Sequence, residues 1–193
     1  MRRAGALQVW DPLVRVFHWL LVACFLVAYI MEDEMLNLHV LVGSIVLGLI
    51  IFRLIWGVAG TEHARFSDFT YSFREIVEHL RSLMCLRSAR HTGHTPAGSV
   101  MIFFLLVGLL LLTMSGLLLY SLENSALHAG GLLSSIGLEV SLLIETMHGL
   151  IADILMFAVI FHVAGVLVET VLQRQNLMLA MITGYKNGGE ENR

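Results

Sequence analysis

Charged residues are scarce in this chain of 193 residues. Asp, Glu, Lys and Arg together make up 14% of it, whereas hydrophobic residues make up 57%. A soluble domain of this length needs more polar surface than that, but a lipid bilayer is itself an apolar solvent and removes the requirement. The net charge of −3 gives no reason to expect nucleic acid as a partner. The composition predicts a single integral membrane domain over residues 1–193, in contact with lipid.

Cysteine is almost absent as well. Cys24 lies in an apolar stretch and Cys85 in a polar loop, so we expect no disulfide between them. Neither cysteine belongs to a Cys-x-x-Cys-His motif, so nothing points to the covalently attached haem of c-type cytochromes.

Long apolar runs, in contrast, are frequent. A helix needs about 20 residues to cross the hydrocarbon core of a bilayer. Four runs approach or exceed this length, at roughly residues 13–30, 38–59, 99–122 and 144–172. We therefore expect an all-α membrane protein built as a bundle of four transmembrane helices.

The only sizeable polar segment between the runs, residues 60–97, has a helical pattern of its own. Its apolar positions are Phe69, Phe73, Ile76, Val77, Leu80, Leu83 and Met84. Charged residues lie between them, namely Arg74, Glu75, Glu78 and Arg81. This pattern predicts an amphipathic helix on the inner membrane surface. It is either a packed surface helix without chemistry or a docking surface for a cytoplasmic partner.

Basic residues are missing from the two remaining loops, 31–37 and 123–143. These loops hold acidic residues instead, namely Glu32, Asp33, Glu34, Glu123 and Glu139. Eleven of the twelve Lys and Arg residues lie in the N-terminal tail, in segment 60–97 or in the C-terminal tail. Because basic loops tend to stay in the cytoplasm, we expect both termini and segment 60–97 to be cytoplasmic and the acidic loops to face outward.

Polar side chains are costly inside a bilayer and are usually functional there. Four histidines lie in the predicted spans, namely His18, His39, His148 and His162. The third span has no histidine, and we expect its Ser115 to be a packing residue. The 14 residues from His148 to His162 correspond to about 21 Å along a helix and to a difference of about 40° around it. A single zinc ion would need ligands one turn apart, whereas this spacing leaves room for two stacked haem sites.

Each haem needs a second axial ligand at a matching depth. The predicted orientation places His18 at the inner end of the first span and His39 at the outer end of the second. We expect His18 and His162 to ligate the iron of an inner haem. In the same way, we expect His39 and His148 to ligate the iron of an outer haem. For each histidine taken alone, an interfacial or hydrogen-bonded role is the alternative.

Two arginines are candidates for binding the haem propionates. Arg53 lies 14 residues after His39, so it shares that helix face at the depth of the inner haem. A buried arginine needs a partner, which a propionate could supply through a bidentate pair. Arg15, one turn before His18, is the second candidate. The alternative for Arg53 is that its side chain extends to the cytoplasmic headgroups.

These residues resemble the prokaryotic cytochrome b561 family, which includes related b-type cytochrome subunits of nickel-iron hydrogenases. The segments that carry the resemblance are Val9–Trp19, Leu38–Gly43, Phe52–Gly57, Met147–Gly149, Phe161–Gly165 and Asn176–Gly184. The resemblance implies a bacterial inner membrane protein with four transmembrane helices and two haem b groups. It also implies that the ligands are on the first, second and fourth helices, which matches the four histidines.

The resemblance further implies quinone chemistry. We expect electron transfer across the membrane between a periplasmic or membrane redox partner and the pool of ubiquinone or menaquinone. Two alternatives stay open: a superoxide:ubiquinone oxidoreductase, and a cytochrome b anchor subunit of a hydrogenase or dehydrogenase complex. If the protein is an enzyme, it is an electron-transfer oxidoreductase, with quinone reduction as its candidate reaction.

Overall fold

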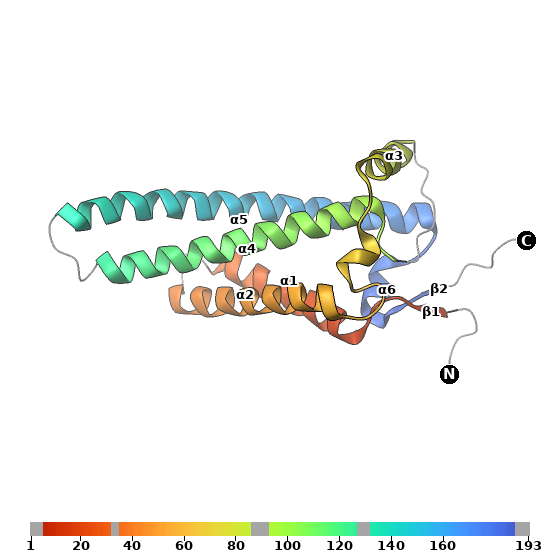
Figure 1. Cartoon of the computed structure of the whole chain (residues 1–193), viewed down its shortest axis with the longest axis horizontal. Helices are drawn as coiled ribbons and strands as arrows, with labels where there is room; N and C mark the ends of the chain where they lie inside the picture. Colours follow the sequence, from red (N-terminus) through yellow and green to blue (C-terminus); the bar gives the residue numbers. More distant parts are fainter. Residues whose placement is uncertain (1–5, 32–34, 86–92, 127–131, 188–193) are drawn as a thin grey trace, which may run out of the picture. The chain divides into compact units, whose positions relative to one another are not determined.

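The computed structural model describes residues 6–31, 35–85, 93–126 and 132–187 (Figure 1). Some residues used to predict the orientation lie outside this range, namely Arg2, Arg3, Glu32, Asp33, Glu34, Arg87, Arg90 and Arg193. The side chain of Glu123 also lies outside the described part.

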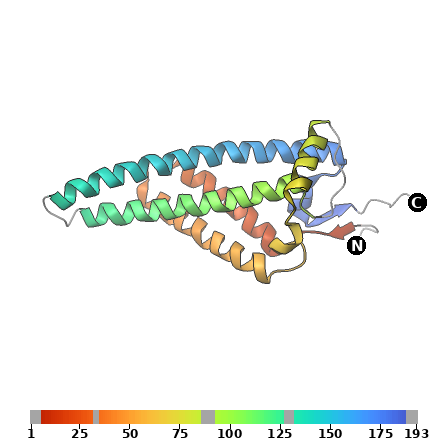
Figure 2. The ribbon, with the colours of Figure 1, turned by 45° about the horizontal axis from the view of Figure 1, so that its top comes forward.

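Four long helices form most of the fold. They are α1 (Pro12–Ile30), α2 (Leu36–Ala59), α4 (Pro96–Ala126) and α5 (Leu132–Gln173). Figure 2 shows each of them as a continuous ribbon. Each contains a stretch that is long and apolar enough to cross a membrane. The prediction of an all-α membrane protein with four transmembrane helices is confirmed.

The third and fourth of these helices are longer than predicted. Segment 123–143 is predicted to be a loop, but α4 continues to Ala126 and α5 begins at Leu132. Glu139 is therefore a helical residue, and the prediction was wrong here. The apolar run of a sequence measures the part of a helix that can cross the membrane. Serine and glutamate end such a run without ending the helix, because neither breaks helical geometry as proline does.

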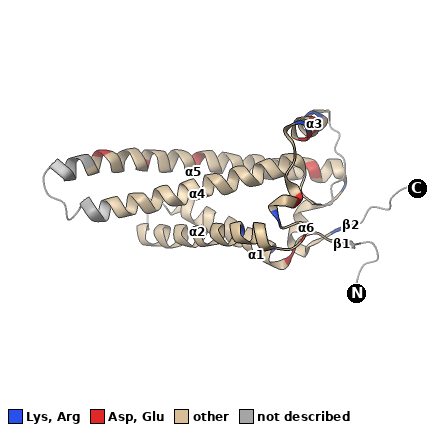
Figure 3. Cartoon of the chain, viewed as in Figure 1, with Lys and Arg blue, Asp and Glu red and all other residues tan. Residues whose placement is uncertain are grey.

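The chain folds into two compact units, each assembled from separate segments. The first unit contains Met1–Trp19, Phe52–Phe103 and Ile160–Arg193, and the second contains Leu20–Ile51 and Phe104–Val159. All twelve Lys and Arg residues of the sequence belong to the first unit. In Figure 3, the Lys and Arg residues that the structure describes are drawn in blue.

The second unit packs around apolar residues of α1, α2, α4 and α5. Its core consists of Phe25, Val46, Ile50, Leu109 and Leu155. Val46 follows His39 by seven residues, and Leu155 follows His148 by seven, with exposures of 3% and 1%. Because seven residues are close to two helical turns, the histidines lie on the buried faces of α2 and α5.

In the first unit, the 3₁₀ helix η1 (Phe66–Phe69) precedes α3 (Phe73–Met84). A capping box starts α3: the Ser72 hydroxyl oxygen accepts from the backbone N–H of Glu75, and the Glu75 carboxylate accepts from the backbone N–H of Ser72. Phe69, predicted to belong to the same helix, is instead buried at the end of η1. The prediction for Phe69 was wrong because helical spacing alone does not reveal where a cap restarts the helix.

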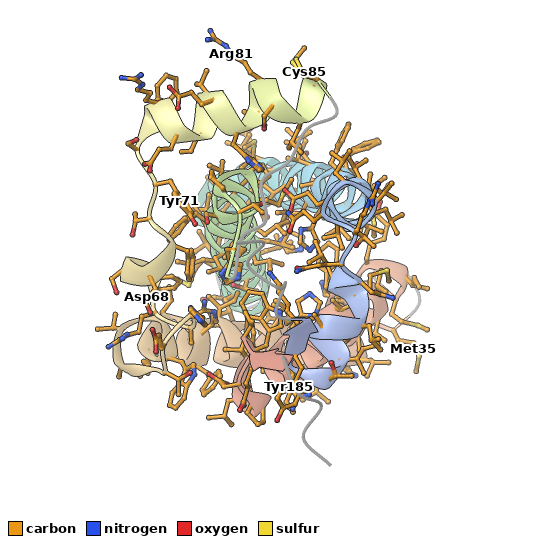
Figure 4. All side chains as sticks on the ribbon, turned by 90° about the vertical axis from the view of Figure 1, so that its right-hand side faces the viewer. Met35, Asp68, Tyr71, Arg81, Cys85 and Tyr185 are labelled. Carbon is orange, nitrogen blue, oxygen red and sulfur yellow. The ribbon has the colours of Figure 1, made fainter. Side chains whose placement is uncertain are left out.

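The position of α3 at a membrane surface stays a prediction. Phe73 and Met84, at its two ends, are 81% and 85% exposed. Figure 4 shows Arg81 and Cys85 pointing outward from this helix.

A short sheet joins the two ends of the described chain. Strand β1 (Ala6–Gln8) pairs antiparallel with β2 (Tyr185–Asn187), which follows α6 (Leu177–Thr183) (Figure 1). Gly184 links α6 to β2 with a φ of 89°, and its carbonyl accepts from the backbone N–H of Trp10. A Cβ atom at Gly184 would lie 2.8 Å from the Trp10 carbonyl oxygen, so both the left-handed backbone and the close approach require glycine.

Candidate functional site

The second unit brings His39 of α2 and His148 of α5 together. Their ring centroids are 6.0 Å apart and their planes are inclined at 70°. A metal–imidazole nitrogen bond is about 2 Å long, so two imidazoles on opposite sides of one metal ion have centroids about 6 Å apart. The observed separation is therefore suitable for two axial ligands of one iron.

Hydrogen bonds orient both imidazoles in the same way. The Nδ1 atom of His39 is 2.9 Å from the carbonyl oxygen of Ala28, so it carries the proton and donates. The Nδ1 atom of His148 is 3.0 Å from the Ser115 hydroxyl oxygen. That hydroxyl donates to the carbonyl oxygen of Leu112 at 2.8 Å, and in this arrangement it accepts from His148, for which the Leu112 carbonyl is a second acceptor. Each Nε2 atom thus keeps its lone pair, the form in which imidazole binds a metal.

A cavity of about 640 Å³ adjoins this pair. It is within the usual range for cofactor sites. Small residues line it beside the histidines: Gly43 on α2, Gly116 on α4 and Gly149 on α5. A Cβ atom at Gly43 or Gly149 would meet nothing within 4 Å. The donor set, the ring separation and the glycine-lined cavity together fit a flat, iron-centred group such as haem.

Sequence reasoning missed two contributions of α4 to this site. Ser115, expected to be a packing residue, is the hydrogen-bond partner of His148. Gly116 allows that imidazole to approach, because a Cβ atom there would lie 2.9 Å from Cε1 of His148. The only signal in the sequence was the presence of small and polar residues in an otherwise apolar span.

The first unit contains His18 and His162, the pair predicted to bind the inner haem. The two side chains are close enough to interact electrostatically. The Nδ1 atom of His18 is buried and has no hydrogen-bond partner among the described residues. Within the part of the chain that the structure describes, no group of three or more His, Cys, Asp or Glu side chains could hold a metal ion.

The two arginines named from the sequence also lie in the first unit. Arg53 is 4% exposed, and its guanidinium carbon lies 4.7 Å from the centre of the Phe66 ring. It is therefore buried and does not extend to the protein surface. One terminal nitrogen of Arg53 and the Nε atom of Arg15 are buried without a partner among the described residues. Arg15 also donates to the Ile182 carbonyl, and Arg53 is within electrostatic reach of Asp11. The remaining unpartnered nitrogens fit the carboxylates of a bound anionic group.

His94 belongs to the same surroundings, although the sequence gave it no role. Its imidazole lies between the rings of Trp10 and Phe69, with centroids 4.4 Å from each. Burial, with the nearby charges of Arg53 and Lys186, lowers the pKa of His94 to about 3, so the ring is neutral at pH 7. Its Nδ1 atom is buried and unpartnered among the described residues.

Asp153, an acidic residue in α5, binds a neighbouring helix. The Tyr29 hydroxyl of α1 donates to Oδ1 of Asp153 at 2.8 Å. Both residues belong to the second unit. This contact links α1 to α5 within that unit.

Four apolar membrane helices with an inward-facing pair of imidazoles are typical of membrane-bound b-type cytochromes. Comparison with protein-family models supports this class, because the model for prokaryotic cytochrome b561 matches residues 9–184. The chain belongs to the prokaryotic cytochrome b561 family. It is accordingly a multi-pass bacterial membrane protein that binds haem b and takes part in electron transfer. Comparisons with curated proteins and with solved structures gave no significant match.

Proposed function

We propose that this cytochrome holds two haem b groups and conducts electrons across the bacterial inner membrane. His39 and His148 would ligate the outer haem, and His18 and His162 the inner one. The support is the pairing of imidazoles within each unit, at 6.0 Å between ring centroids for the first pair and within electrostatic reach for the second. When bound, each haem supplies one-electron redox chemistry, with both axial positions filled by the protein.

The residues of the chain hold and orient these groups. The carbonyl of Ala28 and the hydroxyl of Ser115 fix the tautomers of His39 and His148, which keeps Nε2 available for iron. In the first unit, Arg53 and Arg15 would pair with the propionates of the inner haem, because both have buried nitrogens without a partner among the described residues. The second unit has no Lys or Arg in its sequence, so that unit offers no such pair of its own.

Quinone would react at the inner haem, near His18, Arg53 and His162. We place this end on the cytoplasmic side, with both termini, because the basic residues of the sequence belong to the first unit and basic segments remain inside. The acceptor would be ubiquinone or menaquinone, and the opposite end would face a periplasmic or membrane redox protein.

The 6.0 Å separation of His39 and His148 is the observation on which the proposal rests most. Reduced-minus-oxidised spectra and haem quantification of the purified protein test it. The wild type is expected to contain two b haems with two one-electron transitions. His39→Ala and His148→Ala should each lose the same haem, and the double variant should lose no more than either alone.

His18→Ala and His162→Ala should remove the other haem in the same manner. His63→Asn is a suitable control, because His63 is a loop histidine with a φ of 70°, which asparagine tolerates. It should keep both haems. A single haem in the wild type, or the loss of different haems within one pair, would overturn the assignment.

A further inference from the structure

A buried carboxylate in the first unit lies outside the set of residues proposed to hold haem. Glu169, near the end of α5, is 9% exposed. Its Oε1 atom lies 3.2 Å from Nε2 of His79 on α3 and accepts from the Thr95 hydroxyl at 2.8 Å. Its Oε2 atom accepts from the Gln173 amide at 3.2 Å. His79, Thr95 and Gln173 are themselves buried, at 7%, 7% and 2% exposure.

Glu169 also faces the region of the inner ligand. It follows His162 by seven residues on α5, so it lies about 10 Å further along the helix and within about 20° of the same face. The buried carboxylate is thus two turns from the axial histidine, in the direction of the surface helix α3.

Two further titratable groups of the first unit, Lys186 and His94, are within electrostatic reach of one another. Lys186 of β2 is close enough to Glu169 to interact electrostatically, and its ammonium donates to the Gly93 carbonyl at 2.9 Å. Burial lowers the pKa of Lys186 to about 8, although Glu169 opposes the shift. The next residue after Gly93 is His94, which interacts with Lys186, Arg53 and His162.

A purely structural tie between α3 and α5 would not require ionisable groups. Burying a carboxylate and an imidazole costs more than burying apolar side chains of the same size, and ionisable residues at membrane depth are usually functional. An imidazole has two ring nitrogens that can each hold a proton, so the ring of His79 can take up a proton on one side and release it to Glu169 on the other.

We propose that His79 and Glu169 form the proton entry for quinone reduction in the inner haem region. This inference rests on the proposed function. One quinone takes up two electrons and two protons to form one quinol. The electrons arrive one at a time by way of the haems from the redox partner. The protons come from the cytoplasm through His79, and each carrier is restored by the next proton.

Glu169→Gln and His79→Gln test the proposal in the purified protein with its haems bound. Glutamine keeps the size of glutamate, and at position 79 its amide can still donate to Glu169, but neither variant can carry a proton. Reduced protein is mixed with a short-chain ubiquinone or, separately, with ferricyanide, which accepts electrons without protons. Haem oxidation is followed by absorbance.

We expect both variants to oxidise with quinone at least about tenfold more slowly, within the usual range of general acid–base effects. The slowing of haem oxidation by quinone should become larger as the pH rises, and a small weak acid such as formic acid should relieve it. The variants should also show a larger solvent deuterium isotope effect than the wild type. Oxidation by ferricyanide should be unchanged. Glu78→Gln is the control, because Glu78 is a surface carboxylate on α3 paired with Arg74.

Several results would overturn the proposal. Wild-type quinone kinetics in both variants would show that no proton passes through these residues. Equal slowing with ferricyanide would show that the cluster acts only on structure. If Glu169→Gln fails to fold, His79→Gln decides alone. Failure of the wild-type protein to reduce quinone would instead refute the proposed function itself.

Discussion

The Nδ1 atom of His148 lies 3.0 Å from the hydroxyl oxygen of Ser115, and that hydroxyl donates to the carbonyl oxygen of Leu112 at 2.8 Å. In this arrangement the serine accepts from the imidazole, and the carbonyl of Leu112 is a second acceptor for His148. A hydroxyl on α4, a helix without a histidine of its own, thus helps to set the tautomer of a histidine on α5.

Ser115→Ala should weaken the outer haem site and raise its reduction potential. Loss of the acceptor lowers the basicity of His148, which favours ferrous over ferric iron, and outer-shell changes of this kind typically cost about 10–100-fold in metal affinity. Haem quantification and redox titration measure the two effects. Ser44→Ala is the matched control, because the Ser44 hydroxyl lines the same cavity but donates only to the Val40 carbonyl. Equal effects of the two variants would contradict the role of Ser115.

Gly116→Ala should displace the imidazole of His148. The added methyl group would lie 2.9 Å from Cε1 and 3.4 Å from Nδ1 of the ring, closer than van der Waals contact allows, so the ring must move. We expect loss of the outer haem with the inner haem retained, measured by difference spectra. Gly48→Ala on α2 meets nothing within 4 Å and should keep both haems, with a helix stabilised by up to about 1 kcal/mol. Two haems in Gly116→Ala would show that this close approach is not needed.

Ser115 and Gly116 also show which features of the site could not be predicted from the sequence. The membrane spans were predictable because apolar run length is a property of each segment alone. The position of His39 opposite His148 followed from depth along the helices, which the loop charges set. The rotation of each helix and the choice of neighbour depend on packing between segments far apart in the chain. The sequence therefore gave no indication that Ser115 would bind His148.

The same reason applies to the first unit. The pairing of His79 with Glu169 joins residues 90 positions apart, and that of β1 with β2 joins strands of only three residues each. The candidates His18, Arg53 and His162 could be named from the sequence because each is polar in an apolar run. His94 was not found, because a histidine in a polar segment has no such contrast.

Arg53→Gln should lower the reduction potential of the inner haem selectively. A buried cation favours the reduced state, which carries one more negative charge. At about 8 Å and an effective dielectric constant of about 20, this attraction amounts to roughly 2 kcal/mol. We expect a shift of about −60 mV or more, a tenfold change for a one-electron couple, measured by redox titration. The outer haem is the internal control, since the second unit has no Lys or Arg. Equal shifts of both haems, or none, would exclude Arg53 as a neighbour of the inner haem.

Asp11→Asn should destabilise the start of α1 at neutral pH but not in acid. Oδ1 of Asp11 accepts from the Val14 backbone N–H at 2.8 Å, and Oδ2 accepts from the Trp56 indole at 3.1 Å and from the Thr61 hydroxyl. Burial opposes ionisation, yet the bonds from Thr61, Val14 and Trp56 hold the pKa of Asp11 below its ordinary value. Asparagine would turn an amide toward two donors, at a cost of about 1–3 kcal/mol.

The direction of the pH effect follows from the lowered pKa of Asp11. Because the pKa of Asp11 is depressed in the folded state, its carboxylate stabilises the fold fully at pH values above its ordinary pKa of 3.8. This stabilisation is lost as the pH falls through the folded-state pKa. Thermal unfolding in detergent should therefore separate wild type from Asp11→Asn at pH 7, and the two should converge in acid. Glu62→Gln, which changes an exposed carboxylate next to Thr61, should match the wild type at both pH values. A difference between wild type and Asp11→Asn that does not change with pH would mean that the loss comes from the cap geometry and not from the charge.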